Sequence, residues 1–426
     1  MDYTAHTSRC SKHTSIKSRY YTILPFIFIL CPTVPALLPG GQGEQIIFLI
    51  EVITALWLLS KDVYRLRPNS NELLLLFYFT FSILLDLFQD IIKGVSITSD
   101  FFELAKPLAF ILFYSLYRYS KIDIQEIEKR SLKVIKSLFI ILAIWSIIEI
   151  SFSDYFLNIS YWLYRREEVS VLKNKAIGSF AQTYQFAFIL LLPLTYLLLD
   201  WLKSGGLKKC ILFLLLLTTL LLTQSKSMYV SAGMCIILSL FVPALYRNIK
   251  NTIRIILLMA ALIISMYLLY ILYEDAIRNI LSYALTGFEL MLEGNSNSLN
   301  TRTEQLIWAL QNNQPCIIGG GIGKGEMMLE SFYALYYYRY GLLGLFLYVL
   351  LILITSFKSF RIAKHEEKQN INTSLFYYSM AIFFLISPMA LSSSCHQDTP
   401  KIAFIFYSMI GLINNKFCQI KKGLQN

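Results

Sequence analysis

Long apolar segments alternate with short polar ones along almost the whole chain. With their flanks, the apolar segments approach the roughly 20 residues that an α-helix needs to cross a bilayer. Because the backbone inside lipid must satisfy its own hydrogen bonds, they are expected to be helices. A membrane β-barrel would instead alternate apolar and polar residues, which these runs do not. The predicted spans are 21–38, 46–60, 72–90, 101–118, 134–152, 179–200, 210–223, 228–246, 255–273, 331–355, 374–391 and 401–415.

Composition agrees with this pattern. Hydrophobic residues make up 56% of the 426 residues and charged residues only 15%, whereas soluble domains are nearer one quarter charged. The chain has no internal repeat, low-complexity tract or soluble segment. We therefore predict an all-α polytopic membrane protein of about 12 transmembrane helices, with residues 1–426 forming a single integral membrane domain.

The net charge of +11 is distributed in a way that argues against nucleic-acid binding. Basic residues gather at every second connection between apolar runs, as the positive-inside rule requires of cytoplasmic connections. Both termini are then cytoplasmic, and the amino-terminal apolar run is interpreted as an uncleaved first span instead of a signal peptide. The clusters lie at 9–19, 61–67, 118–136, 203–209, 247–254, 358–368 and 416–422.

Two of the outward connections are long, and long loops on a rigid scaffold often carry binding or catalysis. They are the loops 153–178 and 274–330. In the larger loop, residues 276–292 have apolar residues at helical spacing, which predicts an amphipathic helix at the membrane surface. A capping box at residues 301–304 then predicts a second helix, with Arg302 in its first turn.

A glycine-rich strip at residues 315–325 follows in the same loop. It does not fit a phosphate-binding loop, since Ile318 replaces the first required glycine and Gly325 stands where serine or threonine is needed after Lys324. The strip is expected to be either a flexible hinge or a place where the backbone passes close to a ligand or a helix end.

Cations on the outward side are few. Lys226 lies in a very short turn between two spans, where a charge near hydrocarbon is costly unless it snorkels or pairs with an anion. A lipid diphosphate is one such anion, and arginine is well suited to phosphate oxygens; ordinary headgroup contact is the alternative. The outward cations are Arg165, Arg166, Lys173, Lys175, Lys226, Arg278, Arg302, Lys324 and Arg339.

Other chemical signals in the sequence are weak. No metal-binding motif occurs, and only His396 of the four histidines is predicted to face outward, so no bound metal and no cofactor is expected. Cys316 and Cys395 are the two cysteines placed in outward loops, and an oxidising compartment would permit a disulfide between them, which the sequence alone does not decide. Ionisable residues inside the predicted spans are functional candidates, and they are Glu51, Asp86, Glu103, Lys106 and Glu149. Glu103 and Lys106 share a helix face, so a self-neutralised structural pair is an equal interpretation of those two.

Three stretches together resemble the O-antigen polymerase (Wzy-type) family, which is related to the O-antigen ligases. The first runs from Lys175 through Gly178 into a span, and the second is the turn 222–227 around Lys226. The third runs from Arg302 through Pro315 and the glycine strip to Glu330, Tyr333 and Gly341-Leu-Leu-Gly344. Lysines 175 and 226 replace arginines of the family pattern, and Glu330 stands where the ligases carry histidine, which favours a polymerase.

The resemblance implies a metal-independent glycosyltransferase of the bacterial inner membrane with a periplasmic active site. It would transfer a glycan from undecaprenyl diphosphate onto another lipid-linked repeat unit, with a chain-length regulator and a flippase as possible partners. Lys175, Lys226 and Arg302 would hold the diphosphate, Glu330 would orient or deprotonate the acceptor, and Arg166 and Tyr333 would contact sugar or phosphate. The alternatives are an O-antigen ligase or other polysaccharide polymerase, and a lipid-linked oligosaccharide flippase or secondary transporter. Carriers of this size usually have two similar halves, which this chain lacks.

Overall fold

The computed structural model describes most of the chain. The described residues are 20–35, 37–38, 42–62, 70–93, 100–120, 123–164, 175–242, 297–313, 316–321, 329–371 and 373–423, with nine single helical positions between 253 and 271. Regular structure in these ranges is helical throughout, and no β-strand occurs in them. The predicted all-α fold class is confirmed.

The helices follow the apolar pattern closely. In chain order they are α2 (Gln42–Asp62), α3 (Ser70–Lys93), α4 (Asp100–Arg118), α5 (Ile124–Ser151), α6 (Ser153–Tyr164), α8 (Thr183–Ser204), α9 (Leu207–Leu222), α10 (Lys226–Leu240), α13 (Asn297–Asn312), α14 (Phe332–Lys368), α15 (Ser374–Ala390) and α16 (Pro400–Gly423). Two short 3₁₀ helices, η3 (Leu391–Ser393) and η4 (His396–Asp398), join α15 to α16. Helix α6 occupies the first part of the predicted loop 153–178, so that part is not irregular.

Six helices in the described ranges are long and apolar enough to cross a membrane, namely those at Gln42–Lys61, Glu72–Ile92, Ile124–Ser151, Thr183–Ser204, Phe332–Lys368 and Ser374–Ser393. Shorter apolar helices lie at Tyr20–Leu30 and Lys226–Leu240. Helices α4, α9 and α16 also coincide with predicted spans, but span 255–273 lies mostly outside the described residues. The total of about 12 spans stays a prediction.

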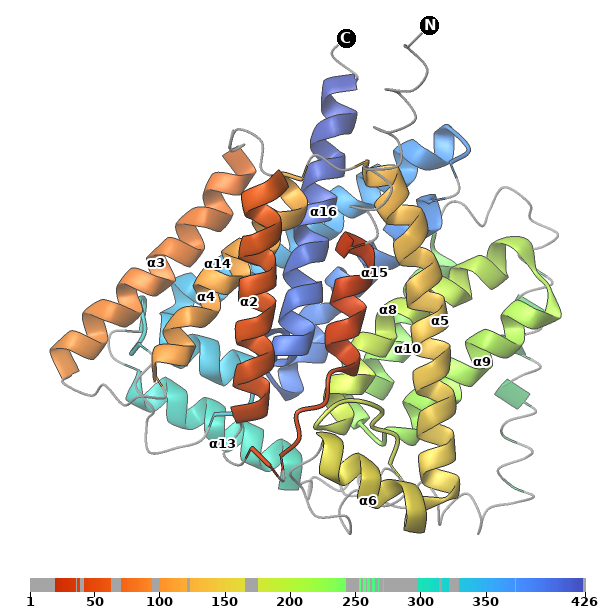
Figure 1. Ribbon diagram of the computed structural model, residues 1–426, viewed down its shortest axis with the longest axis horizontal. Coiled ribbons are helices and arrows are strands. Elements are labelled where there is room, and N and C mark those ends of the chain that lie inside the picture. The colour runs from red at the N-terminus through yellow and green to blue at the C-terminus, as the bar shows by residue number, and fades with distance from the viewer. Residues whose placement is uncertain are drawn as a thin grey trace, which may run out of the picture. The chain divides into compact units, whose positions relative to one another are not determined.

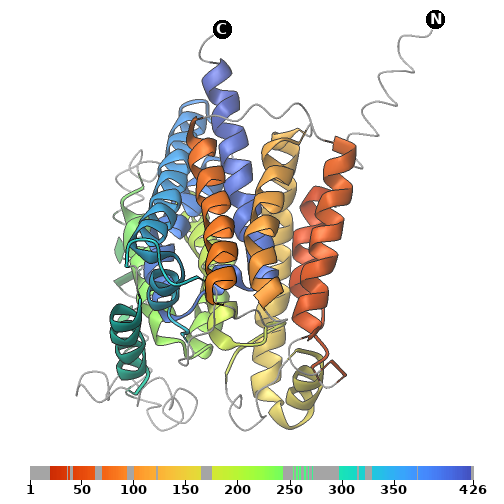
Figure 2. The same cartoon turned by 90° about the vertical axis from the view of Figure 1, so that its left-hand side faces the viewer.

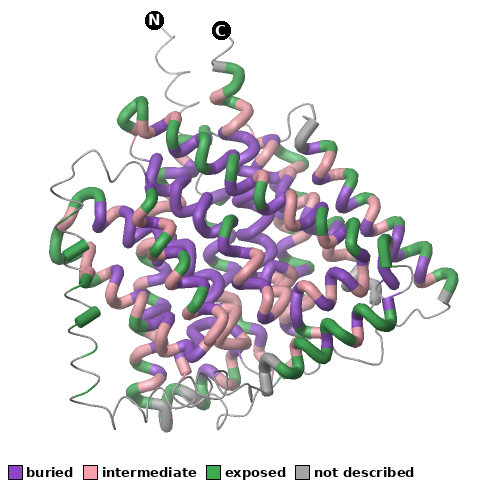
Figure 3. The backbone as a smooth tube through the Cα atoms, turned by 180° about the vertical axis from the view of Figure 1, so that it is seen from behind, coloured by how far each residue is buried: buried purple, intermediate pink, exposed green. Residues whose placement is uncertain are grey.

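Large apolar side chains are exposed along whole helix faces, as expected for a protein surrounded by lipid. On α3, Leu73, Phe77, Leu84 and Phe88 lie on one face and are all exposed. Exposed positions, in green, recur along the outer helices in Figure 3. A continuous apolar face of this size is unusual on a soluble monomer. The surface of the described helices is therefore consistent with an integral membrane protein.

The chain divides into two compact units, of which the first comprises Met1–Leu138, Arg302–Ile362 and Leu391–Asn426. In this unit α16 runs beside α4, and α4 also packs against α2 and α3 (Figures 1 and 2). A Cβ at Gly411 of α16 would lie only 3.1 Å from the carbonyl carbon of Tyr114 in α4. Small residues permit such close approach of helix backbones. Next to this contact the rings of Phe110 and Tyr407 stack with their centroids 4.1 Å apart.

The second unit comprises Phe139–Thr301 and Ala363–Ala390. Helix α8 lies at its centre and packs against α9, α10 and α15. Nearly all residues of α8 between Phe186 and Leu202 are buried, as expected for a helix that is apolar on every side. The ring of Phe188 on α8 meets that of Phe383 on α15 at a centroid distance of 5.2 Å.

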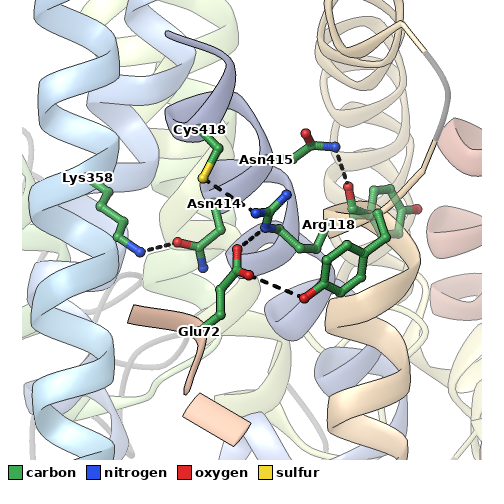
Figure 4. Close-up of polar contacts among 8 residues, drawn as sticks. Glu72, Arg118, Lys358, Asn414, Asn415 and Cys418 are labelled. Atoms are coloured by element: carbon green, nitrogen blue, oxygen red, sulfur yellow. Dashed lines mark hydrogen bonds and ion pairs between the residues drawn. The ribbon is translucent and has the colours of Figure 1, made fainter. Parts of the chain in front are cut away.

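A buried polar cluster in the first unit joins helix ends that border predicted cytoplasmic connections (Figure 4). Arg118, at the end of α4, forms an ion pair with Glu72 near the start of α3. The hydroxyl of Tyr119 donates to the same carboxylate at 3.3 Å. Lys358 of α14 donates to the side-chain oxygen of Asn414 on α16. These contacts hold the ends of four helices together, so we interpret the cluster as structural.

Replacing Glu72 by glutamine is expected to lower the free energy of unfolding by about 3 kcal/mol, because it leaves the partly buried Arg118 charge without its counter-ion. Glu126→Gln is the matched control. It breaks a more exposed ion pair with Arg130 on α5 and should cost less than about 0.5 kcal/mol. Thermal unfolding of both variants in detergent measures the difference, and equal effects would contradict the structural role of the cluster.

Candidate functional site

Helix α14 is broken near its beginning. Gly341 has φ 65° and ψ −170°, a backbone conformation that only glycine adopts readily. A break leaves the first amides of the following helix without intrahelical partners. Here the N–H groups of Leu342 and Leu343 donate to the carbonyls of Cys316 (3.0 Å) and Ile317 (3.1 Å). The chain just before the described glycines therefore caps the second part of α14.

The glycines themselves pair with the other side of the break. The N–H groups of Gly320 and Gly321 donate to the carbonyls of Tyr338 (2.6 Å) and Arg339 (3.0 Å), which close the first part of α14. A Cβ at Gly319 would lie 2.6 Å from the carbonyl carbon of Arg339. The described part of the strip, 316–321, is thus fixed by backbone pairing, and the flexible-hinge interpretation is wrong for it. Of the two predicted roles, close approach to a helix end is the one found.

The segments that carry Arg302 and Glu330 are joined by the side chain of a glutamine on α13. Gln305 lies one turn beyond Arg302 on α13 and is buried. Its side-chain oxygen accepts hydrogen bonds from the backbone N–H groups of Glu330 (3.1 Å) and Ser331 (3.3 Å). Arg302 is partly buried, whereas Glu330 is exposed. Two candidate residues that are 28 positions apart therefore lie on segments that contact each other directly.

The start of α13 differs from the prediction. The capping box at 301–304 predicts that the helix begins at Thr301, but α13 begins at Asn297. Arg302 therefore lies in the second helical turn. The physical reason is that residues 297–300 are helical as well, so the threonine is inside the helix and cannot act as its N-cap.

A third segment, the turn 391–398, packs on the same region and was not predicted as part of the site. Ser331 donates from its hydroxyl to the carbonyl of Ser392 at 3.0 Å. The hydroxyl of Tyr336 on α14 donates to the carboxylate of Asp398, 3.0 Å from one oxygen and 3.2 Å from the other. These bonds fix the two 3₁₀ helices against the beginning of α14.

His396, in the same turn, is close enough to Arg302 for the positive charge of Arg302 to act on its ring. It is fully buried, and its Nε2 lies 3.2 Å from the hydroxyl oxygen of Ser393. Burial and the positive charge of Arg302 lower the pKa of His396 to about 3, so its ring is neutral at physiological pH. The sequence did contain a signal for this residue, since His396 is the one histidine predicted to face outward.

The low pKa of His396 predicts that acid destabilises the fold. Between the ordinary value of 6.5 and about 3, the unfolded chain binds a proton that the folded chain does not. The free energy of unfolding therefore has its full value above pH 6.5 and falls by about 1.4 kcal/mol for each pH unit below it. Melting temperatures in detergent at pH 5.0 and 7.5 measure this, and His396→Gln should show a smaller difference between the two. An unchanged pH dependence in that variant would contradict the assignment.

The segments that carry Lys175 and Lys226 meet in the second unit. The N–H of Ala176 donates to the carbonyl of Leu222 at 2.8 Å, which holds the segment after Lys175 against the turn before Lys226. Gly178 makes the following bend with φ 58°. Lys226 is the first residue of α10, and both lysines are partly buried. Two of the three motif stretches thus meet through their backbones.

The remaining candidates are distributed as follows. Tyr333 lies half-buried in the first turn of α14. Arg166, Lys324 and the predicted amphipathic helix 276–292 lie outside the described residues. Cys316 and Cys395 are not joined by a disulfide bond in the structure. Among the described residues, no group of histidine, cysteine or acidic side chains is placed to hold a metal ion.

No protein-family model matches the chain, and no curated protein matches it either. The function therefore has to be inferred from the chemistry of these residues.

Proposed function

We propose that this chain is a membrane glycosyltransferase of the O-antigen polymerase type. It transfers a glycan from undecaprenyl diphosphate onto a second lipid-linked repeat unit. The observation that supports the proposal is the hydrogen bond between the side chain of Gln305 and the backbone of Glu330. Through it α13, the helix that carries Arg302, contacts the segment that carries the exposed Glu330. A cation for the leaving group and a base for the acceptor are the two groups that this reaction needs.

The reaction follows from these two groups. Glu330 accepts the proton of an acceptor sugar hydroxyl, and the freed oxygen attacks the anomeric carbon of the donor. The bond between that carbon and the diphosphate oxygen breaks as the new glycosidic bond forms. The leaving group is undecaprenyl diphosphate, whose negative charge Arg302 stabilises. The donor bond supplies the free energy, so neither a nucleotide nor a metal enters the scheme.

The other candidates have supporting roles. Lys175 and Lys226 are proposed to hold diphosphate oxygens, and the hydrogen bond from Ala176 to Leu222 fixes the segments that carry them. Tyr333 and Arg166 are proposed contacts for sugar or phosphate. By the positive-inside pattern, the loops that carry these residues face the periplasm of a bacterial inner membrane.

The banding pattern of lipopolysaccharide from a strain that lacks this chain tests the proposal. Loss of the ladder, with one repeat unit still attached to the core, is expected of a polymerase because flipping and ligation continue. Loss of every O-antigen band, the single repeat included, would indicate a ligase or a flippase instead. An unchanged ladder would contradict all three and favour a transporter of another substrate.

A further inference from the structure

The turn 391–398 contains a buried side-chain amide, that of Gln397. Gln397 lies in η4 between two residues with partners in the same unit. On one side, the ring of His396 lies beside the hydroxyl of Ser393, and the charge of Arg302 lowers the pKa of that ring. On the other side, Asp398 accepts the hydroxyl of Tyr336. The backbone of Gln397 is therefore fixed next to the Arg302 region.

The side chain of Gln397 is fully buried. Neither its oxygen nor its nitrogen has a hydrogen-bond partner among the described residues. Buried amides are nearly always hydrogen-bonded, because one without a partner lowers the stability of a fold. A ligand that offers both a donor and an acceptor would satisfy this side chain.

The surrounding chemistry indicates which ligand fits. A neutral amide offers donors and an acceptor, which match the hydroxyl groups of a sugar. Arg302 nearby is suited to the diphosphate that carries the sugar. Because His396 is neutral, it adds no second positive charge at this point.

We propose that Gln397 binds a hydroxyl group of the sugar adjoining the diphosphate in the lipid-linked donor, beside Arg302. This inference rests on the proposed function, since it takes the donor to be a sugar joined to a lipid diphosphate. In this proposal the turn 391–398 recognises the donor sugar, and Arg302 recognises the diphosphate.

Gln397→Met tests the inference, because methionine keeps the length and volume of the side chain but removes the amide. Gln311→Met is the matched control, since Gln311 is exposed on α13. Both purified variants and the wild type are titrated with undecaprenyl diphosphate and with undecaprenyl diphosphate N-acetylglucosamine. Their melting temperatures are measured without ligand.

The expected result has two parts. The wild type and Gln311→Met bind the sugar-bearing lipid about tenfold more tightly than the bare diphosphate, whereas Gln397→Met binds both equally. Without ligand, Gln397→Met melts at the wild-type temperature or higher, since no hydrogen bond to a described residue is lost.

Other results would overturn the inference in distinguishable ways. A Gln397→Met variant that keeps its preference for the sugar-bearing lipid removes the role of Gln397 and leaves the proposed function intact. A melting temperature lowered by several degrees in Gln397→Met alone shows that the amide is structural. Failure of the wild type to bind either lipid contradicts the proposed function, and the inference falls with it.

Discussion

Gly341→Ala is expected to leave little folded protein in the membrane. At φ 65° and ψ −170° a side chain is strained by about 1–3 kcal/mol before any contact is considered. The added Cβ would also lie 2.6 Å from the nitrogen of Gly319 and closer still to the carbonyl oxygen of Ile317. The segment 316–321 would have to move away from the break in α14. The four backbone hydrogen bonds between this segment and α14 would then be lost. The combined cost is about 5 kcal/mol or more, comparable to the whole stability of many domains.

Gly233→Ala is the matched control for this prediction. Gly233 lies within α10, and no described atom stands within 4 Å of the place that its Cβ would take. Alanine has the better helix propensity, so this variant should be stabilised by about 0.5–1 kcal/mol. Yield of membrane-inserted protein and melting temperature in detergent are the measurements. Normal yield and melting of Gly341→Ala would mean that the backbone pairing at the break is not as described.

Arg302→Ala is expected to reduce glycan polymerisation by about 100-fold to 1,000-fold, the usual effect of removing one group that stabilises developing negative charge. Arg302 is partly buried on α13, whose Gln305 fixes the backbone of Glu330. Arg302→Lys should recover only part of the activity, because lysine supplies a point charge without the paired donors of a guanidinium. The measurement is polymer length and yield with a lipid-linked repeat unit as substrate.

Glu304→Ala serves as the control on the same helix, since Glu304 is exposed two residues after Arg302. It should insert normally and retain the wild-type polymer distribution. Full-length polymer from a normally inserted Arg302→Ala variant would refute the assignment of Arg302. A loss of activity equal in both variants would show that α13 acts only as a structural element.

Some of this protein can be predicted from the sequence because the physics involved is local. The length and apolarity of a segment decide whether it can cross a bilayer, and six predicted spans coincide with helices that meet both conditions. The scarcity of outward cations and the motif order identified Arg302, Glu330, Lys175 and Lys226 as candidates. These features need no knowledge of which segments meet in space.

The contacts that assemble the candidate site are of another kind. The interruption of α14 at Gly341 lies inside the predicted span 331–355, because apolar periodicity does not report the φ angle of a glycine. The residues that pair across the break lie 18 to 26 positions apart in the chain, and backbone hydrogen bonds join them. Composition cannot reveal such pairing, since every residue except proline carries the same backbone groups.

The turn 391–398 illustrates the same limit for side chains. In the sequence, His396 and Gln397 are polar residues of a short connection, which would ordinarily be exposed to water. In the structure both are buried, because hydrogen bonds from Ser331 and Tyr336 hold the turn against the beginning of α14. The sequence by itself determined the helices and named most of the candidate charges. Only the tertiary structure decided which of them share a region and which polar groups are buried there, because burial depends on segments far apart in the chain.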